Sequence, residues 1–359
     1  MKRIEEIDYA RVVAMVSVIL IHVTSTYISF ESDFKILDMN IAFILNQVTR
    51  FAVPLFILLS GVSMNLSTAS GNFESFYRKR IFKIGIPYIL WFLIYFAYNN
   101  HSDLNAITVS SFAKSFLLGQ VAPHLYFIII LFQFYLLLPL LKRVIAKAPW
   151  TSVLISFIIS YAIQKLFYFL KFDVDLIPQI IRPYLWILFP TWLFYFVVGL
   201  ALTKARLIYI QKFSTQNSIS ILIATTIFSI FYVIESKASG SLDSIKSSLN
   251  LFTILVFLCS FACWKYIGKY QTVQKVTVFL AKHSMTVYFE HVLVLYMLKQ
   301  FAFFDRGMSG MLLLFLAVFI VATLVAVLID GFAQTLKKWN ILFIFDAHVI
   351  ATCILPLHI

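Results

Sequence analysis

The sequence predicts an all-α integral membrane protein with about ten transmembrane helices and both termini in the cytoplasm. Three observations predict this fold class. Apolar residues make up 61% of the 359-residue chain and charged residues only 13%, whereas about a quarter of the residues in ordinary soluble domains are charged. The apolar residues form runs of about 20, the length that a helix needs to span a bilayer. Basic residues gather in short clusters between these runs.

The apolar runs define the candidate spans, which fill residues 1–359 as a single polytopic domain. In chain order the spans are 9–29, 42–65, 81–98, 125–141, 151–170, 184–203, 218–234, 248–267, 284–303 and 310–333. The first is too long for a cleaved signal peptide, and no small-residue cleavage site follows it. The C-terminal stretch ILFIFDAHVIATCILPLHI is apolar but contains Asp346, His348 and Pro356. These residues favour an interfacial helix over an eleventh span.

The basic clusters predict the orientation. If the N-terminus is cytoplasmic, every cytoplasmic segment is basic, for example 2–3, 78–83 and 337–338. The segments on the other side hold fewer basic residues and more acidic ones, such as Asp33 and Glu235. By the positive-inside rule, both ends of the chain are therefore expected in the cytoplasm. The same distribution accounts for the net charge of +13 without a nucleic-acid partner.

The cysteines indicate neither a disulfide framework nor a metal site. The chain has three, Cys259, Cys263 and Cys353, and all lie in apolar surroundings. Because no pattern of metal-ligand spacing is present, no metal is expected. Cys259 and Cys263, one helical turn apart, are interpreted as packing residues.

Polar side chains in the first span are the leading candidates for function, because charged groups in hydrocarbon are costly. The stretch RVVAMVSVILIH places Arg11 and His22 on one helix face, since eleven residues make three turns plus about 20°. The helical rise separates them by about 16 Å, with His22 near mid-membrane. Asp8 is expected to pair with Arg11 at i, i+3 spacing. The alternatives are an interfacial anchor for Arg11 and a packing role for His22.

A second polar group lies in the span 284–303. By helical rise His291 lies about 12 Å into the membrane, a depth at which it can approach His22. Tyr288 shares a helix face with His291. Glu290 points elsewhere, and it either faces the same cavity from the rim or pairs with a cation such as Arg50 of the second span.

The segment FYRKRIFK (76–83) precedes the third span on the cytoplasmic side. A topology signal explains it fully. A phosphate site is the alternative, because arginine side chains bind phosphates in a bidentate manner. Arg78, Arg80 and Lys83 would form this site, with Arg80 and Lys83 at i, i+3 spacing on one helical face.

Together these stretches resemble the membrane-bound acyltransferase 3 family, whose members are integral membrane O-acyltransferases acting on cell-surface carbohydrates. Five stretches in the family's order carry the resemblance: DYARVVAMVSVILIH, RFAVPLFILLSG, YRKRIFKIGIPY, HLYFIIILFQFYLLLPLL and SMTVYFEH. The first meets the family's Arg-x10-His spacing with Arg11 and His22. Two departures concern binding: Lys83 stands where the family usually has Arg and lacks the planar fork, and Tyr126 stands where it usually has Trp.

The resemblance implies transfer of an acyl group, by family precedent acetyl from acetyl-CoA, to a hydroxyl of a cell-surface or lipid-linked saccharide. His22 would act as general base or transient acyl carrier, with Arg11, oriented by Asp8, positioning the donor. CoA phosphates would be bound by Arg78, Arg80 and Lys83. Substrate-binding candidates are Arg50, His124, Tyr126, Tyr288, Glu290 and His291. The implied surroundings are a bacterial plasma membrane, a saccharide or glycolipid acceptor and glycan-synthesis partners.

Two other functions fit the same residues. An exporter or flippase of a surface polysaccharide would also place charges along an intramembrane pathway. A non-catalytic partner in a glycan-synthesis complex is the other alternative. The sequence holds no Walker-type glycine-rich loop for ATP-driven transport, and binding of CoA would distinguish an acyltransferase from an exporter.

Overall fold

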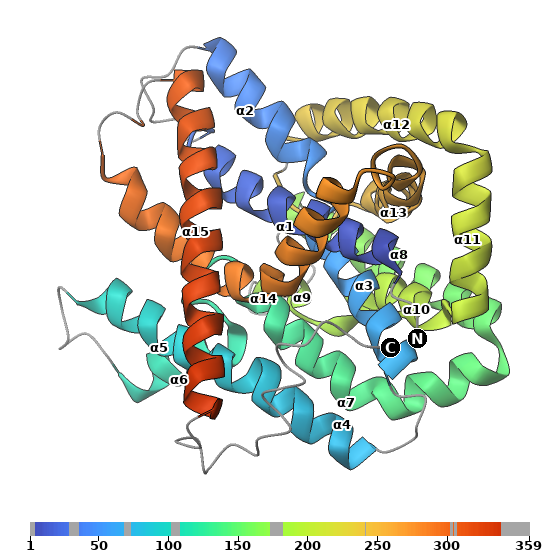
Figure 1. The fold of residues 1–359 in the computed structure, drawn as a ribbon, viewed down its shortest axis with the longest axis horizontal. Helices are drawn as coiled ribbons and strands as arrows, with labels where there is room; N and C mark the ends of the chain where they lie inside the picture. The colour runs from blue at the N-terminus through green and yellow to red at the C-terminus, as the bar shows by residue number, and fades with distance from the viewer. Residues whose placement is uncertain are drawn as a thin grey trace. The chain divides into compact units, whose positions relative to one another are not determined.

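Every regular element in the described part of the computed structural model is a helix, and Figure 1 shows the helices with the labels used below. The described residues are 4–28, 36–67, 73–101, 108–172, 182–240, 242–301, 304 and 307–338. The C-terminal stretch 341–359, for which an interfacial helix was predicted, lies outside them. The chain forms two compact units, and the single domain expected from the sequence stays a prediction.

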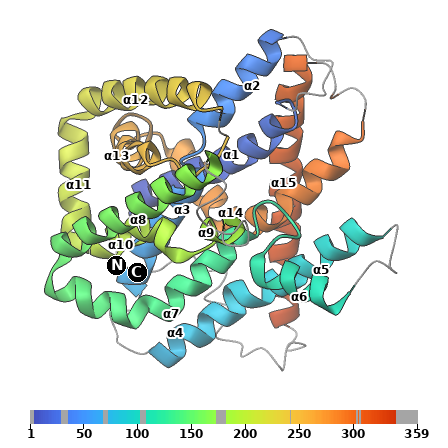
Figure 2. The same ribbon diagram turned by 180° about the vertical axis from the view of Figure 1, so that it is seen from behind.

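Unit 2 combines Lys2–Ser60 with Leu202–Leu328, so helices from both ends of the chain share one core. Its helices are α1 (Glu5–Ser25), α2 (Ile36–Val48), the first part of α3 (Ala52–Ser67), α11 (Lys204–Gln216), α12 (Ser218–Ala238), α13 (Ser248–Ile267), α14 (Gln271–Lys299) and most of α15 (Gly307–Lys338). The central helix is α1, which packs against α2, α13 and α14. Figure 2 shows α13 beside α11 and α12, and α13 packs against both of these helices.

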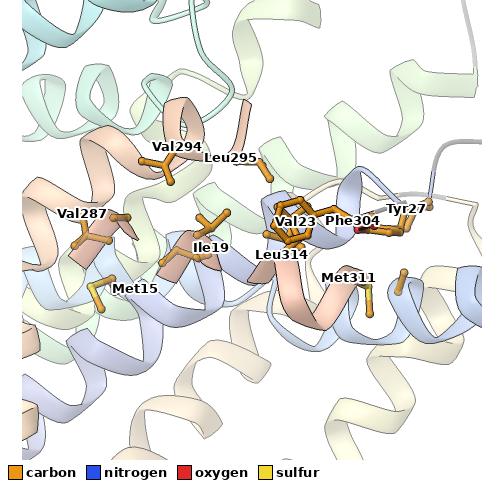
Figure 3. Close-up of a cluster of buried hydrophobic side chains, with 14 of the residues drawn as sticks. Met15, Ile19, Val23, Tyr27, Val287, Val294, Leu295, Phe304, Met311 and Leu314 are labelled. Carbon is orange, nitrogen blue, oxygen red and sulfur yellow. Dashed lines mark hydrogen bonds between the residues drawn. The ribbon is translucent and has the colours of Figure 1, made fainter. Parts of the chain in front are cut away.

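Apolar side chains of α1, α14 and α15 form the core of unit 2 (Figure 3). Met15 and Ile19 lie one turn apart on α1 and face the side on which Val287 of α14 is buried. His22 follows Ile19 at i+3 and therefore lies on the same face of α1. The packing of α1 on α14 thus determines which residues of α14 can meet His22.

Unit 1 consists mainly of Gly61–Ala201. Its helices are α4 (Phe73–Arg80), the π helix η1 (Ile81–Gly85), α5 (Ile86–Asn100), α6 (Val109–Leu118), α7 (Tyr126–Lys147), α8 (Pro149–Phe172), α9 (Arg182–Leu185), the 3-10 helix η3 (Phe189–Trp192) and α10 (Leu193–Ala201). Helix α8 packs against α10, η3 and α7. The Gln133 amide of α7 holds the turn before η3, because it accepts from Phe189 N at 2.9 Å and donates to Ile187 O at 3.0 Å.

The predicted helical membrane fold is confirmed. Among the described residues, eight helical segments are long and apolar enough to cross a bilayer, or nine if the bent pair Phe189–Ala201 and Lys204–Gln216 is one span. The predicted span 284–303 lies in α14, which is a continuous helix but is not among them. Polar side chains such as Glu290 and His291 lower its hydropathy. The orientation of the termini stays a prediction.

The predicted span 42–65 is made of two helices rather than one. Residues 49–51 form a turn between α2 and α3. Pro54 explains the interruption, because it has no N–H to donate to the carbonyl of Arg50 and its ring clashes with that group. In the turn, Arg50 N donates to Gln47 O at 3.1 Å. Arg50 therefore lies at a helix break, where its side chain is not confined to a helical surface.

Candidate active site

The start of α1 carries the ion pair predicted between Asp8 and Arg11. Arg11 Nη1 donates to Asp8 Oδ1 at 3.0 Å, and the two side chains are 19% and 7% exposed. Acidic residues in the first turn of a helix are favoured by the positive end of its dipole. The pairing is thus confirmed, and it gives the Arg11 guanidinium a defined direction on α1.

The centre of the candidate site joins histidines from opposite ends of the chain. The rings of His22 on α1 and His291 on α14 are 5.2 Å apart between centroids, with 49° between their planes. This confirms the expectation that His291 approaches His22. His291 Nδ1 lies 2.8 Å from Tyr288 O and 3.1 Å from Val287 O. Because a carbonyl only accepts, Nδ1 is the donor, so Nε2 carries the lone pair when the imidazole is neutral.

Tyr288 and Glu290 precede His291 on α14, and both are buried. The Tyr288 ring centroid is 6.1 Å from that of His291 and 6.1 Å from that of Phe56 on α3. The predicted common face of Tyr288 and His291 is therefore present, with Phe56 packed edge-on against it. Glu290 is 1% exposed, and its two expected arrangements, at the cavity rim or paired with Arg50, both stay predictions.

Arg50 is held by Asn46, a residue that the sequence analysis did not single out. Arg50 Nε and Nη2 donate to Asn46 Oδ1 at 2.9 and 2.5 Å, and Nη1 reaches Ser244 Oγ at 3.4 Å. Asn46 also donates to Ile21 O, so it joins the Arg50 guanidinium to the turn of α1 that carries His22. A signal for Asn46 was present, because an amide inside an apolar run four residues before an arginine is both unusual and correctly spaced.

The basic cluster Arg78, Arg80 and Lys83 lies in unit 1, at the end of α4 and in η1. The Arg80 guanidinium carbon lies 5.3 Å from the ring centroid of Phe76 and 6.0 Å from that of Tyr135. Lys83 lies in a π turn, in which hydrogen bonds run from i to i+5. Its direction relative to Arg80 therefore differs from that of the α-helical i, i+3 pair assumed from the sequence.

His124 and Tyr126, at the start of α7, lie in an aromatic cluster of unit 1. His124 is 3% exposed, and its ring packs at 5.5 Å and 72° against that of Tyr95. The Tyr126 ring centroid is 4.4 Å from that of Trp186 and 6.4 Å from that of Trp192. Their role in acceptor binding stays a prediction.

Potential metal ligands are not grouped in the described part of the chain, where no three His, Cys, Asp or Glu side chains could hold one ion. Cys259 and Cys263 are free, with sulfur atoms 3.8 Å apart on α13. The candidate sites are therefore the basic cluster of unit 1 and the polar side chains of unit 2 described above, namely Asp8, Arg11, His22, Arg50, Tyr288, Glu290 and His291.

Comparison with known proteins identifies the chemistry. A family model described as an acyltransferase domain, Acyl_transf_3, matches residues 4–331. "Putative membrane-bound acyltransferase YfiQ" of Bacillus subtilis (strain 168) is 23% identical over 297 residues, which are 80% of this chain and 80% of that protein. No solved structure matches this chain. Because the family model covers nearly the whole sequence and the apolar helices are those of a multi-pass membrane protein, this chain belongs to the acyltransferase 3 family and is a membrane acyltransferase.

Proposed function

We propose that this acyltransferase moves an acyl group, acetyl in the simplest case, from cytoplasmic acyl-CoA to a hydroxyl of a cell-surface or lipid-linked saccharide. The observation that carries the proposal is the meeting of His22 and His291, 5.2 Å apart, in a membrane acyltransferase. A hydroxyl is a weak nucleophile near neutral pH, so its acylation needs a base. An imidazole inside the helix bundle supplies that base.

His22 is proposed as the base. Its ring nitrogen takes the proton from the acceptor hydroxyl while the hydroxyl oxygen bonds to the thioester carbonyl carbon. The tetrahedral oxyanion then collapses, the carbon–sulfur bond breaks, and the imidazolium returns the proton to the leaving CoA sulfur. In the second form of the proposal His22 itself carries the acyl group between thioester and hydroxyl.

The neighbouring side chains have distinct proposed roles. Arg11, oriented by Asp8, positions the donor. Arg50 places a positive charge beside the reacting centre, where negative charge develops on the carbonyl oxygen. Tyr288, Glu290 and His291 bind the acceptor from α14, and His291 Nε2 offers a lone pair to an acceptor hydroxyl.

The basic cluster of unit 1 is proposed to bind the CoA phosphates. The Arg80 guanidinium lies over the rings of Phe76 and Tyr135, and this cation–π contact uses the face of the guanidinium plane. Its in-plane N–H groups then remain suited to a phosphate. Arg78 and Lys83 add charge, Lys83 as an ammonium without a planar fork.

Arg80→Ala should raise the KM for acetyl-CoA about tenfold or more while kcat stays near the wild-type value, since a charge-assisted hydrogen bond contributes about 1.5–3 kcal/mol. The measurement is initial-rate kinetics on membranes with equal amounts of protein. Arg143→Ala is the matched control, because Arg143 is a basic residue of α7 in the same unit that is exposed and outside the cluster. An unchanged KM for Arg80→Ala would leave the cluster as a topology signal only.

His124 and Tyr126 are proposed to contact the acceptor, with Trp186 and Trp192 completing an aromatic cluster of the kind that packs against sugar rings. The proposal places the protein in a bacterial plasma membrane as one polytopic domain with both termini in the cytoplasm. Glycan-synthesis proteins are the proposed partners.

The direct test supplies radiolabelled acetyl-CoA to membranes that contain the protein and to matched membranes that lack it. The proposal expects label in the saccharide fraction only in the first, and mass spectrometry of cell-surface glycans from a deletion strain to show a missing acetyl group. Purified protein should also bind CoA. Normal glycans in the deletion strain together with no CoA binding would overturn the proposal.

A further inference from the structure

We propose that Asn46 is a positioning residue for acyl transfer, which fixes the Arg50 guanidinium relative to the backbone at His22. This inference rests on the proposed function of His22. It concerns unit 2 alone, where α1 packs against α2.

The amide nitrogen of Asn46 bonds to α1 next to His22. Asn46 Nδ2 donates at 3.0 Å to Ile21 O, and it lies 3.0 Å from both Thr24 Oγ1 and Ser25 Oγ. The Ile21 carbonyl belongs to the peptide bond that joins Ile21 to His22. The Thr24 and Ser25 hydroxyls donate within α1, to Leu20 O and Ile21 O, so their oxygens are suited to accept from Asn46.

The amide oxygen of Asn46 binds Arg50. Asn46 Oδ1 accepts from Arg50 Nε and Nη2 and, at 3.2 Å, from Gln47 Nε2. Only one orientation of the amide satisfies both Ile21 O and Arg50, because guanidinium groups only donate and carbonyls only accept. The Asn46 side chain is fully buried. One planar group of fixed length therefore connects the His22 backbone to the Arg50 guanidinium.

The chemistry of the amide suits this role. A carboxylate at position 46 would also accept from Arg50, but it would neutralise the guanidinium and could not donate to Ile21 O. An amide orients the cation without cancelling its charge. The charge thus remains available to the negative oxygen that develops during acyl transfer beside His22.

The test is a double-mutant cycle on the full-length protein in membranes, with radiolabelled acetyl-CoA as the probe. Asn46→Ala should lower kcat per folded molecule about tenfold or more, with the KM for acetyl-CoA unchanged. In an Arg50→Ala background the same change should cost less than about twofold, because its target is gone. Thr49→Val, which removes a buried hydroxyl that donates to Leu45 O and Asn46 O of its own segment, should leave kcat unchanged.

The isosteric Asn46→Asp keeps the acceptor for Arg50 and loses the donor to α1. It should also lower kcat about tenfold, and it remains informative if Asn46→Ala does not accumulate. Equal losses from Asn46→Ala in both backgrounds, or a wild-type kcat for Asn46→Asp, would overturn the inference. His22→Gln is measured in parallel. If it keeps the wild-type rate, the proposed function is wrong, whereas an inactive His22→Gln with an additive Asn46 cycle rejects the role of Asn46 alone.

Discussion

Replacing His22 with alanine is expected to lower the rate of acyl transfer by a factor of about 100 to 10,000, the contribution typical of general acid–base catalysis. The imidazole lies against His291, 5.2 Å away between centroids, and no side chain at that position of α1 can then take the hydroxyl proton. His291 stays in place in this variant, held by the hydrogen bonds from Nδ1 to the carbonyls of its own helix, and its proposed role is to bind the acceptor rather than to take its proton.

The measurement is label transferred from acetyl-CoA per mole of folded protein, with the folded amount taken from size-exclusion chromatography. His22→Gln provides a variant closer in size in case the alanine variant folds poorly. His101→Ala is the control, because His101 is an exposed histidine at the end of α5, outside the candidate site. Transfer by both His22 variants at more than half the control rate would reject His22 as base and as carrier.

The same experiment separates the two proposed roles of His22. If His22 carries the acyl group, label should remain on the wild-type protein after rapid denaturation in the absence of acceptor, and His22→Gln should abolish it. If His22 is a general base, the protein should carry no label while transfer to the acceptor proceeds. Either result is accompanied by the loss of transfer in the alanine variant.

Replacing Gly61 with valine is expected to destabilise the protein by about 3 kcal/mol, the upper part of the range for overpacking. Gly61 belongs to the RFAVPLFILLSG stretch and lies on α3 where that helix meets α10. A Cβ at this position would lie 2.9 Å from Leu200 N and 3.0 Å from Gly199 Cα, and closer still to Phe196 O. Because these are backbone atoms, no change of rotamer relieves the clash. Small residues at such crossings are what allow membrane helices to approach closely.

Gly331→Val is the matched control, because Gly331 is a helical glycine of α15 with no atom within 4 Å of an added Cβ. Thermal unfolding in detergent, followed by fluorescence-detected size exclusion, should show a lower midpoint for Gly61→Val and a smaller decrease for Gly61→Ala. Gly331→Val should match the wild type. Equal midpoints for the two valine variants would show that α3 and α10 do not approach as closely as described.

Sequence reasoning predicted the helical membrane fold and the pair on α1 because both depend on local properties. Helix length and apolar content determine which runs can span a bilayer. The Asp8–Arg11 pair follows from the i, i+3 geometry of a single helix. Helix α14, which contains the predicted span 284–303, has the length of a span but carries buried polar groups, whose stability depends on the neighbouring helices.

Residues that act through contacts between helices were harder to predict. The approach of His291 to His22 was expected from depth alone, whereas the ring arrangement depends on how α1 packs on α14 in the apolar core around Met15, Ile19 and Val287. Asn46 was missed because its partner Ile21 lies on a different helix, 25 residues earlier in the chain, and the local spacing to Arg50 does not show that contact. The π turn at Lys83 was missed because hydropathy does not distinguish it from an α-helical turn.

By itself the sequence determined that this chain is a helical membrane protein of the acyltransferase 3 type, with a histidine and an arginine on one face of its first span. Only the tertiary structure decided that His22 meets His291 and that Asn46 joins the His22 backbone to Arg50. The physical reason is that periodicity and composition determine each helix separately. Contacts between side chains depend on which helix faces meet and on where a residue such as Pro54 interrupts a helix.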